Sequence, residues 1–406
     1  MIALVHARLI DGTGADAVDD ATVLVDGNRI AAVGQGAGYP KGARVVDLSG
    51  LTVLPGLIDA HVHFGGFVVD DPNRTFSYWS VFPFFFDFAR NFRKRRMLAV
   101  EHGVTTVRSA GDNYPHILEL RDRIASGKLV GPRIVAAGPI FTAPGGHPAG
   151  TIYKKNRYVI DHATRQVDDA VAARAEVRSL ADRGVDAIKA IYSSVNPFDL
   201  DHPVPKLRLP VLEAIAEEAH AQGLPVMVHT GDPDDTFAAV QAGADTIEHG
   251  ILPGTQSAEF PSELVDLMLD RGTHFVPTLS AAWAMQRMHP GTLGQSMRLV
   301  AQLHRAGVPV AVGTDAGAPG VVIGKAAHRE MALLTEAGFS PLEAIRAATQ
   351  TAAETLGRAH DLGTVEVGKL ADLVAVGGDP SADVSAAREV RWVIKDGAIV
   401  LRRLGR

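Results

Sequence analysis

The feature that most constrains the fold is an alternation of short apolar runs with longer segments whose apolar residues recur every three or four positions. The runs are Leu54–His61, Val104–Ser109, Arg133–Gly138, Asp186–Ile191, Pro225–Thr230, Thr246–Gly250, His274–Leu279 and Pro309–Thr314; the longer segments include Val167–Arg183, Pro210–Gln222 and Glu263–Arg271. Such runs are typical of buried parallel strands, and such segments are typical of amphipathic helices. Eight strands alternating with helices predict an α/β fold of the (β/α)8 TIM-barrel type.

A doubly wound open sheet is the alternative for a chain with this alternation. That fold usually places a glycine-rich turn after its first strand. The run Leu54–His61 lacks such a turn, which favours the barrel. The spacing between runs is also too irregular for a solenoid of equal repeats.

Both ends of the chain have a different pattern, in which short β-type runs are separated by tight-turn pairs. The runs are Ile2–Leu9, Ala21–Val25, Arg29–Val33 and Ala43–Leu48 at one end, and Ala371–Val376, Glu389–Lys395 and Ala398–Leu401 at the other. Neither end is long enough to build a core alone. We therefore predict a small β-sandwich domain assembled from both termini, residues 1–55 plus 359–406. The barrel would span residues 56–358.

Composition excludes several classes of function. Forty basic and 46 acidic residues give a net charge of −6 without a basic run, so we expect no nucleic-acid partner. The chain has no cysteine, which excludes disulfides and thiolate metal sites, whereas its 16 histidines leave nitrogen and oxygen as metal ligands. No apolar run approaches the roughly 18 residues that span a bilayer, and the start does not resemble a signal peptide. We expect a cytoplasmic protein without a membrane partner.

Titratable residues recur at the carboxyl ends of the predicted strands, where the active site of a (β/α)8 barrel lies. These residues are His61, His63, Lys189, His229, His249 and Asp315. His61 and His63 are two positions apart, so on a strand both imidazoles point to the same face and can reach one ion. One histidine at a strand end is usually a packing residue, but coincidence at five strand ends favours a metal site.

Lys189 is the unusual member of this set because apolar residues flank it in the middle of a predicted strand. A charged amine is costly there unless an acid pairs with it. The alternative to such a salt bridge is a neutral amine that adds carbon dioxide to form a carbamate. A carbamate has two oxygens and can bridge two cations.

These residues resemble the motifs of the amidohydrolase superfamily. The resemblance rests on the segment VLPGLIDAHVH from Val53 to His63, on the strand-end residues above, and on the tail GTVEVGKLAD from Gly363 to Asp372. It covers nearly the whole chain. Gly145-Gly146-His147 and the segment from Ala337 to Pro341 resemble more closely the branch of imidazolonepropionase-like proteins and metal-dependent prolidases, or Xaa-amino-acid dipeptidases.

The resemblance implies a centre of two divalent metal ions, and the ligand types suit zinc. His61, His63 and Asp315 would hold one ion, His229 and His249 the other, and a carbon dioxide-derived carbamate on Lys189 would bridge them. A hydroxide shared by the ions would attack the scissile carbonyl. Asp315, the catalytic residue, would take its proton and pass it to the leaving nitrogen.

Other side chains are weaker candidates. Asp59 and Glu248 would orient imidazoles, with ordinary packing as the alternative. For substrate binding we predict four residues, each with a structural alternative: His147, Tyr192, Arg108 and His328. The alternatives are a surface loop for His147, packing at the barrel rim for Tyr192, an ion pair for Arg108 and a surface position for His328.

The leading prediction is a hydrolase that cleaves an amide (C–N) bond of a small molecule, a dipeptide or an N-acyl amino acid. Other amides, carbamates, ureas, lactones and esters suit the same chemistry. A mononuclear deaminase is less favoured because no Glu follows His229 and because Lys189 is present. A scaffold protein without activity is disfavoured because all six predicted ligands are intact. The Phe-rich segment 82–88 could be a lid, an interface or core, and the resemblance implies a homo-oligomer.

Overall fold

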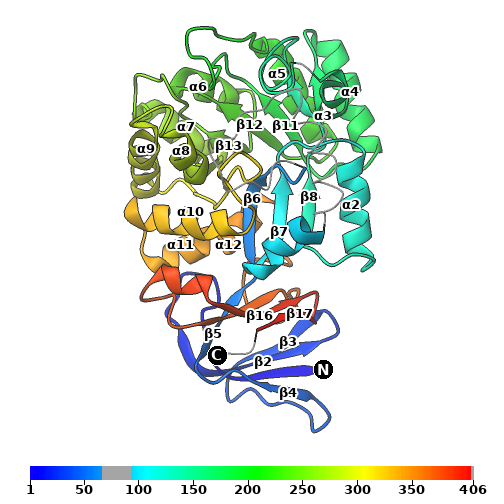
Figure 1. The fold of residues 1–406 in the computed structure, drawn as a ribbon, viewed down its shortest axis with the longest axis vertical. Helices are drawn as coiled ribbons and strands as arrows, with labels where there is room; N and C mark the ends of the chain where they lie inside the picture. The colour runs from blue at the N-terminus through cyan, green and yellow to red at the C-terminus, as the bar shows by residue number, and fades with distance from the viewer. Residues whose placement is uncertain (66–92, 155, 404–406) are drawn as a thin grey trace.

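The computed structural model describes residues 1–65, 93–154 and 156–403. The molecule is elongated: strands from the two ends of the chain lie at one end of the long axis, and the alternating strands and helices occupy the other (Figure 1). The predicted Phe-rich segment 82–88 lies outside the described residues.

Strands from both termini form one eight-stranded sheet. Its members are β1 (Ile2–Leu9), β2 (Val18–Asp26), β3 (Arg29–Gln35), β4 (Arg44–Asp47), β5 (Leu51–Pro55), β15 (Leu373–Gly377), β16 (Val390–Lys395) and β17 (Ala398–Arg402). The order is β17-β16-β15-β5-β1-β2-β3, with β4 paired to β1. The two ends meet where β5 and β15 pair antiparallel, with Val53 opposite Ala375. One apolar cluster, which includes Leu4, Val23 and Leu373, packs this sheet.

The middle of the chain contains two parallel sheets. The first has the order β6 (Leu57–Val62), β7 (Val104–Ser109), β8 (Arg133–Ala136); the second has the order β10 (Thr164–Gln166), β9 (Ile140–Thr142), β11 (Ile188–Ile191), β12 (Val226–Thr230), β13 (Thr246–His249), β14 (His274–Val276). The residues of β6, β7, β11, β12 and β13 are all buried, as expected for strands covered on both faces. Because the strands are parallel, their carboxyl ends share an edge.

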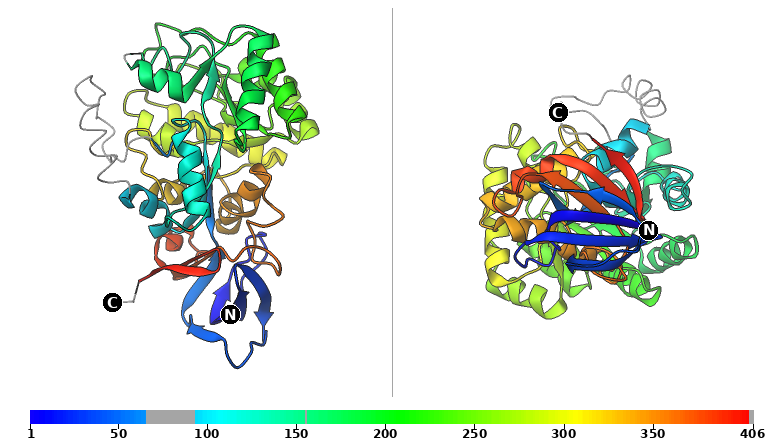
Figure 2. Two further views of the ribbon diagram at one scale, coloured as in Figure 1. Left: turned by 90° about the vertical axis from the view of Figure 1, so that its right-hand side faces the viewer. Right: turned by 90° about the horizontal axis from the view of Figure 1, so that it is seen from below.

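Helices occupy the segments between these strands. They include α2 (His116–Ala125), α3 (Arg157–Ala163), α4 (Ala170–Asp182), α5 (Leu209–Ala221), α6 (Pro233–Gln241), α7 (Ser262–Arg271), α8 (Leu279–Met285), α9 (Thr292–Ala306), α10 (Lys325–Glu336), α11 (Pro341–Ala347) and α12 (Gln350–Thr355), with a 3-10 turn, η2, at Val384–Arg388. Seen from below, the sheet formed by the two chain ends faces the viewer, and the helices lie around and behind it (Figure 2). Within the described parts of the chain, no helix combines the length and apolar character needed to cross a membrane.

The helix α4 illustrates why the sequence forms these elements. Asp169 caps its start by accepting hydrogen bonds from the backbone N–H groups of Val171 and Ala172. Ala173, Val177 and Leu180 then recur at four- and three-residue spacing on its buried face. The predicted helical segments 167–183, 210–222 and 263–271 correspond to α4, α5 and α7.

Two predicted strands differ from the structure. The run Leu54–His61 spans two strands, because the chain passes from β5 to β6 at Gly56, whose N–H donates to Asp372 O at 2.8 Å. The run Pro309–Thr314 is not a regular strand. Val310 in this run forms a single parallel bridge with Phe275 of β14, and Ala316, two residues after the run, forms one with Val62 of β6. This segment therefore lies between the two parallel sheets and contacts both.

Candidate metal centre

The carboxyl ends of the parallel strands bring four predicted histidines together. His61 lies in β6 and His63 follows it, His229 lies in β12, and His249 ends β13. The ring centroids of His61 are 5.5 Å from His63 and 5.0 Å from His249, and those of His229 and His249 are 4.4 Å apart. Four imidazoles from three strands thus form one continuous cluster.

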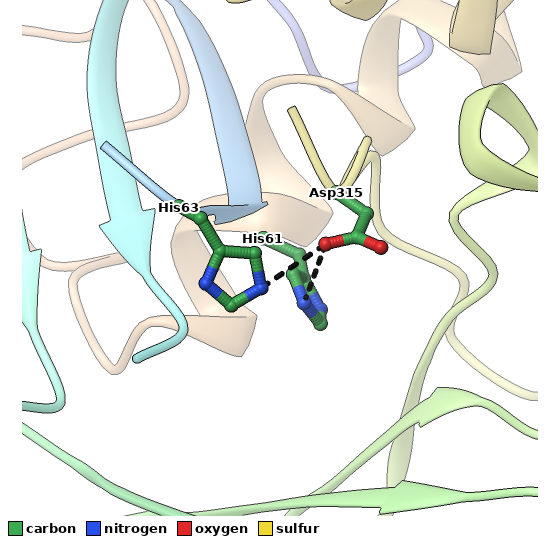
Figure 3. A group of neighbouring side chains, drawn as sticks. All are labelled: His61, His63 and Asp315. Carbon is green, nitrogen blue, oxygen red and sulfur yellow. Dashed lines mark ion pairs between the residues drawn. The ribbon is translucent and has the colours of Figure 1, made fainter. Parts of the chain in front are cut away.

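Asp315 completes a compact group with His61 and His63. Its Oδ1 lies 3.1 Å from Nε2 of His63 and 3.6 Å from Nε2 of His61 (Figure 3). Each of the three residues offers one ligand atom, and these atoms all lie within 4.8 Å of one another. Two imidazole nitrogens and one carboxylate oxygen at this spacing are a donor set that suits zinc.

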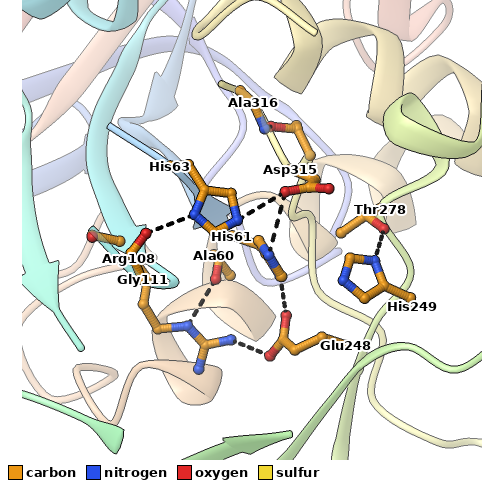
Figure 4. A network of polar contacts seen from close by, with 12 residues as sticks. Ala60, His61, His63, Arg108, Gly111, Glu248, His249, Thr278, Asp315 and Ala316 are labelled. Atoms are coloured by element: carbon orange, nitrogen blue, oxygen red, sulfur yellow. Dashed lines mark hydrogen bonds and ion pairs between the residues drawn. The ribbon is translucent and has the colours of Figure 1, made fainter. Parts of the chain in front are cut away.

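The ring of His61 is oriented by a buried charge pair. Its Nδ1 lies 2.5 Å from Oε2 of Glu248, and Nη2 of Arg108 donates to Oε1 of Glu248 at 2.9 Å (Figure 4). Arg108 also donates from Nε to Ala60 O at 2.7 Å. A proton on Nδ1 leaves Nε2 of His61 unprotonated toward Asp315, which is the tautomer that a metal requires. For Arg108 the structure shows the ion pair that the sequence left as the alternative to a substrate contact.

Two further histidines are oriented in the same way. Nδ1 of His63 lies 2.7 Å from Gly111 O, and Nδ1 of His249 lies 2.6 Å from Oγ1 of Thr278. Asp59 differs from the expectation that it orients an imidazole. Its carboxylate instead accepts the backbone N–H groups of His61 at 3.3 Å and Thr314 at 3.1 Å, and so fixes the backbone on which the histidine sits.

Backbone strain is concentrated at this centre. His249 has φ 68°, Asp315 has φ 58° and Thr278 has φ 51°. Left-handed conformations at non-glycine residues cost on the order of 1–3 kcal/mol each and persist where the surroundings hold them. The backbone at Gly313 packs closely against this centre, because an added Cβ atom would lie 2.3 Å from Cγ1 of Val276 and 2.9 Å from Cβ of His61.

Lys189 of β11 is buried, with 2% of its surface exposed. Among the residues that the structure describes, its Nζ has no hydrogen-bond partner. The pKa of Lys189 is lowered to about 8, mainly by burial; the carboxylate of Glu248 opposes this shift and the cation of Arg108 adds to it. The amine is therefore closer to its neutral, nucleophilic form than an ordinary lysine is.

The protonation states of the cluster suit a cation. Burial lowers the pKa values of His61 and His229 well below the usual histidine value, and it lowers that of His249 to about 4. For His63 burial acts in the same direction and is the largest single cause, but the hydrogen bond and charge of Asp315, the charge of Asp112 and the hydrogen bond to Gly111 together outweigh it and raise the pKa. Although burial would raise the pKa of Asp315, its contact with His63 lowers it. Neutral imidazoles and an ionised carboxylate are the forms that bind metal, so His61, His229, His249 and Asp315 already favour the binding form, whereas His63 would have to give up its proton to a cation.

His147 and Tyr192 both lie beside this cluster. The ring centroid of His147 is 5.7 Å from that of His229, and its Nδ1 lies 2.7 Å from Oγ1 of Thr151. Burial lowers the pKa of His147 to about 4. Tyr192 follows β11, is buried, and donates its backbone N–H to His229 O at 2.9 Å. The ring of His147 is therefore near His229, whereas Tyr192 contacts His229 through its backbone and its ring packs in the apolar core, with its centroid 4.8 Å from Nζ of Lys206.

His328 is not among the strand-end residues. It lies in α10, and its Nε2 is 2.8 Å from the backbone oxygen of His102. Only 4% of its surface is exposed, so the surface position considered for it is wrong. The apolar face of α10 turns the residue inward.

The sequence did not single out three residues that support the centre. Asp112 accepts the backbone N–H groups of Phe64 and Gly65, both at 2.8 Å, and thereby fixes the chain after His63. Thr278 contacts His249, and Glu330 holds the chain that follows Thr278. Asp112 lies shortly after the predicted run Val104–Ser109 and Thr278 lies at the end of the predicted run His274–Leu279, so a search of strand ends could have found both. Glu330 lies inside a helix and gave no such signal.

The sequence of this chain is similar to those of known proteins. The profile of the amidohydrolase family matches residues 52–400. An ochratoxinase from Aspergillus niger is 27% identical over 424 aligned residues, which cover 97% of this chain and 84% of that protein. An imidazolonepropionase from Streptomyces griseus subsp. griseus is 26% identical over 387 residues, covering 90% of this chain and 87% of that protein.

The fold is also similar to solved structures. A crystal structure of an Xaa-Pro dipeptidase with methionine bound in its active site superposes with a TM-score of 0.81 and 30% sequence identity. The match covers 98% of this chain and 99% of that chain.

Proposed function

Because the chain belongs to the amidohydrolase family and is a hydrolase acting on carbon–nitrogen bonds, we propose that it cleaves the amide bond of a dipeptide or an N-acyl amino acid with the help of two metal ions. The observation that carries the proposal is the convergence of four imidazoles, one carboxylate and one buried amine. His61, His63 and Asp315 form the compact group among the described residues. His229, His249 and Lys189 extend it.

The residues fit a pair of divalent cations. His61, His63 and Asp315 would hold one ion and His229 with His249 the other, while Lys189, after reaction with carbon dioxide, would bridge them. The donors are nitrogen and oxygen, which suit zinc. The buried Nζ of Lys189, without a hydrogen-bond partner among the described residues, gains by carboxylation the contacts that it lacks. When bound, the ions supply Lewis acidity toward the scissile carbonyl and a lowered pKa for water.

Asp315 is positioned to move the proton in this reaction. It is the one carboxylate in the compact group, and its side chain is 22% exposed, so a substrate can reach it. Its contacts with His63 and His61 keep it ionised. We infer that Asp315 accepts a proton from the attacking water and delivers it to the leaving nitrogen.

The substrate class rests on His147 and on similarity. The Xaa-Pro dipeptidase, whose structure spans this chain almost completely, acts by its name on a dipeptide. His147 stacks with Phe198, which is 54% exposed, at a centroid distance of 6.5 Å. An imidazole next to His229, with an exposed aromatic ring stacked on that imidazole, suits a substrate that joins a polar amide to an apolar group.

The proposal extends to the architecture. The two parallel sheets and the segment 309–316 between them would form one (β/α)8 barrel over residues 56–358. The terminal sheet would be the small β-sandwich of residues 1–55 and 359–406. The parallel bridges from Val310 to Phe275 and from Ala316 to Val62 support closure on one side.

Hydrolysis assays test this function. The protein is reconstituted with zinc and bicarbonate, and release of free amino acid is measured for a panel of dipeptides and N-acyl amino acids, with ureas, carbamates and lactones alongside. We expect turnover of the first two classes. Asp315→Asn should lower kcat by about 10²–10⁴-fold with a smaller change in KM.

The matched control is Asp361→Asn, because Asp361 pairs with Arg358 away from the cluster. It should retain wild-type kinetics. Metal-loaded protein that turns over none of the amides, or an Asp315→Asn variant with full activity, would overturn the proposal.

A further inference from the structure

The start of helix α8 has an unusual cap. A threonine before a helix ordinarily turns its hydroxyl to accept a backbone N–H of the first turn. Thr278 precedes α8 but makes no such bond. Its Oγ1 is directed instead to Nδ1 of His249, 2.6 Å away (Figure 4).

Glu330 caps α8 in place of Thr278. It lies in the middle of α10 and is completely buried. One carboxylate oxygen accepts the N–H of Leu279 at 2.6 Å, and the other accepts the N–H of Ser280 at 2.7 Å. The Ser280 hydroxyl donates back to Ala326 of α10 at 3.1 Å. The first turn of α8 is therefore fastened to α10.

Thr278, the residue before α8, has a strained backbone. Thr278 has φ 51° and ψ 45°, a left-handed conformation that a β-branched residue rarely adopts. Its carbonyl accepts the N–H groups of Ala281 at 2.9 Å and Ala282 at 3.2 Å. The two residues after it are held by Glu330, so both sides of the peptide are fixed and the strain persists.

We propose that Glu330 is a positioning residue for His249. By capping α8 it frees the Thr278 hydroxyl to accept a hydrogen bond from Nδ1–H of His249. With the proton held on Nδ1, Nε2 is unprotonated and can bind a cation. Because α10 is the first helix after Asp315, the same contact links the segment of one predicted ligand to the orientation of another. The inference rests on the proposed function, in which His249 holds the second ion.

Zinc affinities of four variants test the proposal. Stepwise zinc binding is measured by competition with a chromophoric chelator for the wild type, Glu330→Gln, Thr278→Val and the double variant, with Thr278→Ser as the conservative replacement. We expect Glu330→Gln and Thr278→Val each to weaken one of the two ions about 10–100-fold and to leave the other unchanged. The double variant should bind that ion no more weakly than the single variant with the lower zinc affinity. Thr278→Ser should retain the wild-type zinc affinity.

A second measurement does not need the metal. The ring ¹⁵N shifts of His249 in metal-free protein report the tautomer, which should be Nδ1-protonated in the wild type and mixed in Glu330→Gln and Thr278→Val. Glu218→Gln is the control for loss of a buried carboxylate, since Glu218 is buried and pairs with Arg178 in a different part of the fold. It should change neither readout.

The inference fails if Glu330→Gln lowers the Tm but leaves zinc affinities and the His249 ring shifts unchanged. It also fails if the effects of the two single variants add in the double variant, because Glu330 would then not act through the Thr278 hydroxyl. A wild type that binds fewer than two zinc ions would overturn the proposed function instead, and the ring shifts would still decide the role of Glu330.

Discussion

At the scale of single residues, the centre is governed by which ring nitrogen carries the proton. His61, His63 and His249 each place Nδ1 against an oxygen: a carboxylate, a backbone carbonyl and a hydroxyl. In each case a proton on Nδ1 directs the unprotonated Nε2 away from that partner. These orienting oxygens, rather than the histidines alone, prepare the centre for a cation.

His328 has a measurable effect on stability because it is buried without charge. Burial lowers its pKa to about 4 from 6.5, so the unfolded chain binds a proton below pH 6.5 that the folded chain does not. The stability from this residue is therefore present above pH 6.5 and is lost as the pH falls toward 4. When the pH is lowered from 7 to 5, the unfolding free energy of the wild type should fall by about 2 kcal/mol more than that of His328→Gln.

Urea denaturation of both proteins with a chelator present measures this difference, because titration of the other histidines is common to both. His116→Gln, in which an exposed histidine beside Glu119 is replaced, is the control and should follow the wild type. Parallel pH profiles for wild type and His328→Gln would contradict the assignment.

At the scale of elements, most strands could be predicted from the sequence, but the shortest strands could not. The run Val104–Ser109 coincides with β7 and Ile2–Leu9 with β1, since alternation and turn signals are local. β9 and β10 have three residues each and carry too little pattern to be recognised. The predicted strand Pro309–Thr314 forms an isolated bridge at Val310 instead of a regular ladder, because its pairing is set by the neighbouring strands. The strand-end ligand candidates were predictable because parallel strands end at one edge, whereas Glu330 depends on a tertiary contact.

Gly313 tests whether close approach of this segment shapes the centre. Its added Cβ would meet Cγ1 of Val276 at 2.3 Å and Cβ of His61 at 2.9 Å, and neither can move without shifting a buried strand. We expect Gly313→Ala to lower the unfolding free energy by about 1–3 kcal/mol and to weaken zinc binding.

Calorimetry and zinc titration check both effects. Gly42→Ala is the matched control, because nothing lies within 4 Å of its added Cβ, and it should be close to neutral. Wild-type stability and zinc affinity in Gly313→Ala would show that the segment adjusts freely.

At the scale of the whole molecule, the terminal sheet and the parallel strands are joined by buried charge. Nη2 of Arg133, at the start of β8, contacts Asp372 at 3.2 Å and Asp396 at 2.5 Å. Asp372 is buried, and its backbone oxygen accepts the N–H of Gly56 where β5 passes into β6. The sequence predicted that both termini contribute to one β unit but could not predict this joint, because its members are far apart in the chain.

Removing Arg133 should destabilise the molecule without affecting metal binding. Arg133→Met leaves the buried carboxylate of Asp372 without its cation, which costs about 3–5 kcal/mol. Denaturant unfolding should show this loss, while zinc content stays at the wild-type value. Arg391→Met removes an exposed pair with Glu389 and should cost less than about 1 kcal/mol. Equal costs for the two variants would contradict the structural role of the joint.

The central claim is a pair of metal ions bridged through Lys189, and zinc content per chain tests it most directly. Wild type, Lys189→Ala and the control Lys395→Ala, in which another buried strand lysine is replaced, are reconstituted with zinc and bicarbonate. We predict about two zinc ions in the wild type and in Lys395→Ala, with a fall to one or fewer in Lys189→Ala. About one ion in all three proteins would contradict the bridged pair, and no zinc in any of them would contradict metal-dependent hydrolysis itself.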